Sequence, residues 1–261
     1  MKQNNRNDLY NLKEQRRTIV SVAYHAKQGH LSSCFSVLEI LNVLYKKAMN
    51  VDLNNIDSED NDKTILCKGH ASLALYSLFY DLGILSKEQI YSFTKFESIL
   101  GEHPDKNKIP GIDISTGSLG HGFPAAVGMA IGYKIKKKQN RVFAVVGDGE
   151  CNEGSIWEAA FVASDRGLDN LTCIVDDNNS ECHMPNLGAK FASFGWDVCE
   201  VDGNNTSELE QALLSKHIKP LFVWAHTKKG FGSQIMQNEP EKWHHKIITD
   251  EDFANLMEEL K

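Results

Sequence analysis

Residues 141–149 read Arg-Val-Phe-Ala-Val-Val-Gly-Asp-Gly, and this stretch decides the fold class of the chain. Its apolar run is too short for a helix and is stopped by Gly147. Such a run is typical of a strand with both faces buried, as in parallel sheets that are covered by helices. The sequence therefore predicts a parallel strand that ends at a Gly-Asp-Gly turn.

The residues downstream continue the same pattern. A helix is predicted from about Ser155 to Arg166, and a second apolar run, Leu171 to Val175, predicts the next strand. The crossover between these two parallel strands should be right-handed. Two more strands are predicted at Asp197 to Val201 and Leu221 to Ala225, with the helix Ser207 to His217 between them.

Upstream, helical periodicity predicts helices over 37–45, 71–82 and 120–138. No repeat, low-complexity tract or linker interrupts the chain, so we expect residues 1–261 to form one domain. The fold class expected is α/β, with a mostly parallel sheet and helices on both faces. Ligands bind beyond the carboxyl ends of the strands in such sheets. The residues after Val146, Val175 and Ala225 are therefore the first candidates for a site.

Composition excludes several classes of protein. The 28 Lys and Arg against 35 Asp and Glu give a net charge of −7, which argues against a nucleic-acid-binding domain. No stretch approaches the roughly 20 apolar residues of a membrane span, and the polar first eight residues do not resemble a signal peptide. The six cysteines include no CxxC pair, and Cys182-His183 has no second pair at zinc spacing. We expect reduced thiols and a cytoplasmic protein that contacts neither nucleic acid nor membrane.

Two polar turns follow the first two predicted strands. Glycines flank Asp148 and allow a close approach to a ligand, while helix amides near Ser155 favour an anion. A hard divalent cation between carboxylate and phosphate would reconcile these charges, with oxygens from Asn178 and the Ser180 backbone. Either turn alone is explained by the need of the chain to reverse direction. The presence of both turns on adjacent strand ends is a more specific sign of a ligand site.

The spacing of these turns resembles the thiamine diphosphate fingerprint, and more of the chain resembles the amino-terminal half of transketolase. The similarity runs from about His25 to Phe253. The segments that carry it follow the family's order along the chain: Gly29-His30, Lys68-Gly69-His70-Ala71, Glu102-His103-Pro104, Ser115-Thr116-Gly117-Ser118-Leu119-Gly120, Gly147-Asp148-Gly149, Asn152-Glu153-Gly154 and Asn178-Asn179.

The resemblance implies thiamine diphosphate as the cofactor, held through Mg²⁺ or alternatively Ca²⁺ or Mn²⁺. The implied metal ligands are Asp148, Asn178 and the carbonyl of Ser180. The implied cofactor-binding residues are His70, Gly117, Ser118, Leu119, Asp148, Gly149, Glu153 and Asn178. Among them, Gly149 matches an amide on the diphosphate. Glu153 matches a buried glutamate that pairs across the family's dimer.

The resemblance also implies catalytic histidines, His30, His103 and His244, lining the channel to the thiazolium. An imidazole can take a proton from a sugar hydroxyl and return it near neutral pH, because its ordinary pKa is about 6.5. Three departures from the family stand out. Residues 29–34 lack its proline or glycines, His121 replaces its usual Gln, and His245 competes with His244 for one position.

The function implied is transfer of a two-carbon ketol unit from a ketose or ketose phosphate to an aldose. In the family, the glutamate that activates the cofactor lies in a second domain, for which 261 residues leave no room. We therefore expect a separate carboxy-terminal subunit that carries this glutamate, in an α2β2 assembly.

Two alternatives stay open at this point. One is the α-type subunit of a 2-oxo acid dehydrogenase or decarboxylase, against which Gly69-His70 and Glu102-His103-Pro104 count. The other is a non-catalytic scaffold paralogue, against which the intact Asp148 and Asn178 count.

Overall fold

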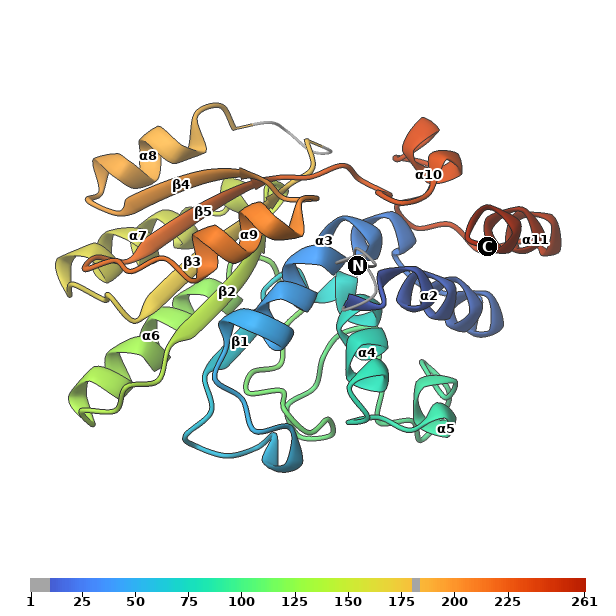
Figure 1. The fold of residues 1–261 in the computed structure, drawn as a ribbon, viewed down its shortest axis with the longest axis horizontal. Helices are drawn as coiled ribbons and strands as arrows, with labels where there is room; N and C mark the ends of the chain where they lie inside the picture. Colours follow the sequence, from blue (N-terminus) through green and yellow to red (C-terminus); the bar gives the residue numbers. More distant parts are fainter. Residues whose placement is uncertain (1–9, 180–183) are drawn as a thin grey trace, which may run out of the picture.

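A five-stranded parallel sheet forms the centre of the molecule (Figure 1), in the strand order β1-β2-β3-β5-β4. The computed structural model describes residues 10–179 and 184–261. The strands are β1 Lys63–Leu66, β2 Val142–Gly147, β3 Leu171–Asp177, β4 Asp197–Asp202 and β5 Leu221–His226. The predicted α/β fold with a parallel sheet is confirmed. The polar first eight residues, Ser180 and Cys182-His183 lie outside the described residues.

Helices cover both faces of this sheet (Figure 1). The helices are α2 Leu12–Ala26, α3 Leu31–Val43, α4 Ser72–Asp81, α5 Lys87–Ile90, α6 Gly122–Ile135, α7 Gly154–Asp165, α8 Leu187–Ser193, α9 Thr206–Leu213, α10 Gln234–Asn238 and α11 Asp250–Glu259. Within the described residues, no helix is both long and apolar enough to cross a membrane.

Alternate residues of β2 pack into two separate apolar cores. Phe143 and Val145 join the core of α2, α3, α4 and α9, whereas Val142, Ala144 and Val146 join the core of α6, α7 and α8. All six residues of β2 are buried, as its apolar run predicts. Because both cores pack against the same strand, the position of the carboxyl end of β2 is fixed from two sides.

Periodicity alone does not predict β1, because its Lys-Thr-Ile-Leu run is short and begins with polar residues. In the structure it pairs in parallel with β2, in the register Lys63 to Val142, at one edge of the sheet. Its carboxyl end leads through Lys68 into a turn at Gly69–Ala71. The end of β1, which the sequence did not identify, therefore lies beside the end of β2.

Candidate active site

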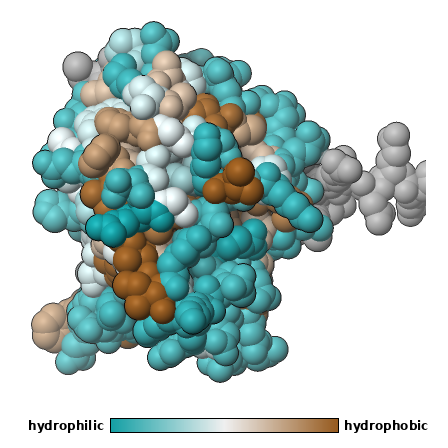
Figure 2. Space-filling model, turned by 90° about the vertical axis from the view of Figure 1, so that its left-hand side faces the viewer, coloured by the Kyte–Doolittle hydropathy of each residue, from teal (hydrophilic) through white to brown (hydrophobic). Residues whose placement is uncertain are grey.

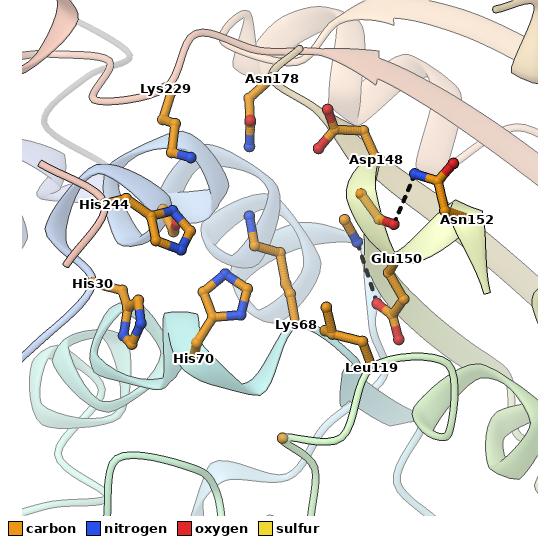
Figure 3. A pocket seen from close by; sticks show the side chains of 14 residues that line it. His30, Lys68, His70, Leu119, Asp148, Glu150, Asn152, Asn178, Lys229 and His244 are labelled. Atoms are coloured by element: carbon orange, nitrogen blue, oxygen red, sulfur yellow. Dashed lines mark hydrogen bonds between the residues drawn. The ribbon is translucent and has the colours of Figure 1, made fainter. Parts of the chain in front are cut away.

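A pocket of about 450 Å³ lies at the carboxyl ends of β1, β2 and β3 (Figure 3). This volume suits a cofactor-sized ligand. Its lining consists of His30, Ser33, Lys68, His70, Gly117, Leu119, Gly147, Asp148, Gly149, Glu150, Asn152, Asn178, Lys229 and His244. Figure 3 shows the histidines on one side and Asp148, Glu150 and Asn152 on the other. We call these the histidine region (His30, His70, His244) and the strand-end region (Lys68, Asp148, Glu150, Asn178).

Asp148 follows β2 directly and is only 8% exposed. Its backbone N–H donates to the carbonyl of Asp176 on β3, at 3.3 Å. Burial raises the pKa of the Asp148 carboxyl, and the nearby Asp176 carboxylate raises it further, whereas Lys68 lowers it. A buried carboxylate beside other carboxylates gains most from a bound cation.

Asn178 lies one residue beyond the end of β3. Its Oδ1 atom is buried and accepts no hydrogen bond from the residues that the structure describes. Buried polar atoms normally have partners, so an oxygen left over in a pocket indicates a ligand. Together with the Asp148 carboxylate, this oxygen fits a hard cation such as Mg²⁺. Ser180, the third residue implied, lies outside the described residues.

A buried ion pair joins the turn after β1 to the end of β3. Lys68 Nζ contacts Asp176 Oδ2, and both residues are almost completely buried. The same Asp176 carboxylate accepts hydrogen bonds from Ser36 Oγ, at 2.7 Å, and from Thr227 Oγ1. These contacts supply both oxygens of the buried Asp176 carboxylate with partners. The pair therefore holds the ammonium of Lys68 at the pocket wall.

Glu150 connects the Gly117–Gly120 loop to the end of β2. Its Oε1 accepts from the Gly120 N–H at 2.8 Å, and its Oε2 accepts from the Gly147 N–H at 3.4 Å. The residue is 1% exposed, and burial raises the pKa of its carboxyl to about 7. Its two backbone bonds fix the loop relative to the strand end.

The Gly117–Gly120 loop lies very close to neighbouring backbone. A Cβ placed on Gly69 would lie 2.7 Å from the Gly117 backbone nitrogen, and one on Gly117 would lie 2.8 Å from the His103 ring. Gly117 has φ of +143°, which favours glycine. Leu119 lines the pocket, whereas Ser118 lies outside the lining and its Oγ is 3.2 Å from His121 Nδ1.

Three histidine rings meet on the opposite side of the pocket. Ring centroids are 5.2 Å apart for His30 and His70, 5.3 Å for His30 and His244, and 5.8 Å for His70 and His244. Burial lowers the pKa of His30 to about 4 and that of His70 to about 2, where Lys68 adds to the effect. These two imidazoles are therefore neutral at neutral pH and can accept a proton from a bound hydroxyl.

Three residues named from the sequence lie just outside this lining. His103 is exposed, and its ring lies against Gly117. Glu153 is exposed in the single chain and lies against Gly120, although the resemblance implies a buried glutamate at a subunit interface. Between the two adjacent histidines, it is His244 that lines the pocket, while His245 lies at its outer edge against His30.

The structure adds lining residues to which sequence reasoning gave no role: Ser33, Lys68, Glu150, Asn152 and Lys229. Three of them had a signal in the sequence: Lys229 follows the end of β5, and Lys68 and Asn152 belong to segments that carry the family resemblance. Glu150 had none, because only the folded loop shows that its carboxyl meets Gly120.

Comparisons with known proteins agree with this geometry. The family model described as "Transketolase, thiamine diphosphate binding domain" matches residues 11–260. One subunit of the apulose-4-phosphate transketolase of Phocaeicola vulgatus is 34% identical, over 94% of this chain and 90% of that protein. The 6-deoxy-6-sulfo-D-fructose transketolase subunit SqwG of a Clostridium species is also 34% identical, over 89% of this chain and 88% of that protein.

Among solved structures, transketolase from Campylobacter jejuni superimposes with a TM-score of 0.87 at 27% sequence identity. The alignment covers 95% of this chain and 42% of that transketolase. This chain therefore corresponds to one part of a longer solved enzyme, and to nearly the whole of the two relatives that are named as subunits.

Proposed function

The chain belongs to the transketolase family through its thiamine diphosphate-binding domain, and we propose that it is the amino-terminal subunit of a two-chain transketolase. The reaction is transfer of a two-carbon ketol unit from a ketose or ketose phosphate to an aldose. The observation that carries the proposal is a single pocket that joins the buried carboxylate of Asp148 to His30 and His70, whose imidazoles burial keeps neutral. We also propose that residues 1–261 form one domain, supported by two cores that share one sheet.

The strand-end region suits the charged end of the cofactor. We propose that Asp148, Asn178 and the carbonyl of Ser180 hold Mg²⁺, or Ca²⁺ or Mn²⁺, against the diphosphate. The orphaned Asn178 oxygen and the buried Asp148 carboxylate support this role. Gly149 and Lys229 also line the pocket, and the amide of Gly149 and the ammonium of Lys229 would bind the diphosphate.

The loop of Gly117, Ser118 and Leu119 would pack beside the aminopyrimidine, and His70 would contact the cofactor. The fixed position of this loop supports the first role. It is bound to the strand end through Glu150 and to β1 through Thr116, whose Oγ1 donates to the Leu66 carbonyl at 2.8 Å.

When bound, thiamine diphosphate supplies the carbon nucleophile and electron sink that allow a ketose C2–C3 bond to break. The chain's own part is proton transfer and positioning. As that bond breaks, a sugar hydroxyl must lose its proton, and an imidazole nitrogen of His30, which burial keeps neutral, or of His244 can accept it. His103, nearer the outside, would orient the sugar hydroxyls. The same histidines return a proton to the oxygen of the acceptor aldehyde.

A separate partner subunit is part of the proposal. Support comes from the relatives that are themselves named as transketolase subunits, nearly all of whose length this chain covers.

Exposed apolar side chains also gather on α6 and α7, among them Ile135, Phe161 and Val162. Figure 2 shows brown patches on the face where α6, α7 and α8 lie. We propose that this face meets other subunits of an α2β2 assembly, with Glu153 at the interface and the activating glutamate on the partner.

The two alternatives are less well supported. The Phocaeicola and Clostridium relatives are named as transketolase subunits and the Campylobacter structure as a transketolase, which does not favour a 2-oxo acid dehydrogenase. A non-catalytic scaffold would not need the buried carboxylate of Asp148 or neutral histidines in the pocket. A cytoplasmic location remains part of the proposal, supported by the free thiols of all five described cysteines.

Two measurements test the proposal. Calorimetric titration of the chain with thiamine diphosphate should give Mg²⁺-dependent binding, and its absence would contradict the cofactor site. The complex with a co-expressed partner subunit should convert a ketose such as xylulose 5-phosphate in the presence of an aldose. Turnover of pyruvate in place of every ketose donor tested would support the 2-oxo acid alternative instead.

A further inference from the structure

A second group of possible metal ligands lies at the outer edge of the histidine region. It consists of His30 Nδ1, Glu102 Oε1 and His245 Nε2, which all lie within 4.8 Å of one another. The His30 nitrogen is 3.4 Å from the Glu102 oxygen, and the His245 nitrogen is 3.8 Å from the same oxygen. These atoms come from three segments that are distant in the sequence, so only the folded chain brings them together.

Each ligand is ready to bind an ion. His30 Nδ1 is buried and has no hydrogen-bond partner among the residues that the structure describes. The second oxygen of Glu102, Oε2, accepts a hydrogen bond from Gln28 Nε2 at 2.7 Å. This bond orients the carboxylate and leaves Oε1 facing the two histidines.

We propose that His30, Glu102 and His245 form a binding site for Zn²⁺, with a fourth position open to water. Two imidazoles and one carboxylate are a frequent ligand set for this ion, whereas the oxygen-only strand-end site suits Mg²⁺. Tetrahedral Zn²⁺ with ligands at about 2.0–2.2 Å separates those ligands by roughly 3.5 Å. The observed separations need only a small shift of His245, whose side chain is exposed and able to move.

A bound ion would have a direct effect on the pocket. It would occupy Nδ1 of His30, whose ring lies next to those of His70 and His244. The imidazole could then no longer accept a proton at that atom. The site is therefore inhibitory, and it makes the pocket sensitive to zinc at its outer edge. Zinc binding itself does not depend on the proposed transferase reaction.

The test uses the full chain in excess Mg²⁺, so that the oxygen site is saturated. Co²⁺, a spectroscopic substitute for Zn²⁺, is titrated while its visible absorption is recorded, and Zn²⁺ is then added in competition to give its affinity. One equivalent of Co²⁺ should produce the intense band of a tetrahedral site. His245→Ala and Glu102→Gln should each weaken Zn²⁺ binding by about tenfold or more. Gln28→Ala, which releases the carboxylate, should weaken it by about tenfold.

His217→Ala is the matched control, because this histidine lies at the far end of the α9 segment, where its Nδ1 contacts the Lys219 carbonyl. It should leave the affinity unchanged. Because His245 is exposed and Glu102→Gln keeps the side-chain shape, both variants should fold, which circular dichroism checks. Absence of the Co²⁺ band, or unchanged Zn²⁺ affinity in either ligand variant, would overturn the proposal.

Discussion

The two sides of the pocket are built in opposite ways. The strand-end region is buried, and its charges are fixed by the ends of three adjacent parallel strands and by the Lys68–Asp176 pair. The histidine region comes from separate connections around residues 30, 70 and 244, and the partly buried rings of His30 and His70 are neutral at neutral pH. Holding a charged cofactor requires charges that do not move. Moving protons requires groups that can change their charge.

The largest effect is expected when the Asp148 carboxylate is removed from the strand-end region. Asp148→Ala should abolish Mg²⁺-dependent binding of thiamine diphosphate, because it removes the anionic ligand from a hard-cation site. Calorimetric titration measures this. Asp169→Ala, which removes a surface carboxylate, should bind the cofactor like wild type. Retained affinity in Asp148→Ala would place the cofactor elsewhere.

The buried Lys68–Asp176 pair, which supports the strand-end region, should be nearly as sensitive to substitution. Lys68→Met leaves the Asp176 carboxylate buried without its cation, which should lower the free energy of unfolding by about 3–5 kcal/mol. The matched control is Lys134→Met, which breaks the exposed Lys134–Asp169 pair and should change stability by less than about 1 kcal/mol. Urea denaturation compares the two. Equal losses of stability in the two variants would mean that the burial of the Lys68–Asp176 pair does not determine its contribution to stability.

At His103, which lies just outside the pocket lining against Gly117, we expect a change in rate without a change in cofactor binding. His103→Ala should keep its affinity for thiamine diphosphate, while turnover of the two-chain enzyme falls by roughly 10²–10⁴-fold. Steady-state kinetics with a ketose donor and calorimetry on the same variant measure both. His217→Ala serves as the control. An unchanged rate would return His103 to a structural role beside Gly117.

The smallest effect concerns the pH dependence of stability. The pKa of His70 is about 2 in the folded chain, against 6.5 when exposed, so below pH 6.5 only the unfolded chain gains this proton. Stability should therefore fall as the pH drops, by up to about 1.4 kcal/mol per pH unit from this residue. His70→Asn should lose less stability than wild type between pH 8 and pH 5 in urea titrations. If the stability of both proteins fell equally between pH 8 and pH 5, the lowered pKa of His70 would be contradicted.

The pattern that places Asp148 and Asn178 at neighbouring strand ends is local, so the sequence alone could predict it. Asp148 and Asn178 each follow a buried apolar strand, and adjacent parallel strands end at the same edge, so their proximity follows from the βαβ pattern. Lys68 and Glu150 received no role. The strand before Lys68 is short and partly polar, and the partner of Glu150 is the amide of Gly120, which lies far from it in the sequence.

The sequence by itself determined the fold class, the strand ends that carry Asp148 and Asn178, and the family to which the chain belongs. Tertiary structure alone decided that His244 lines the pocket and that His245 lies at its edge with Glu102. The physical reason is the distance along the sequence over which each feature is determined. Strand periodicity and strand ends are set by neighbouring residues, whereas the direction of a side chain after a long connection depends on which distant segment packs against it.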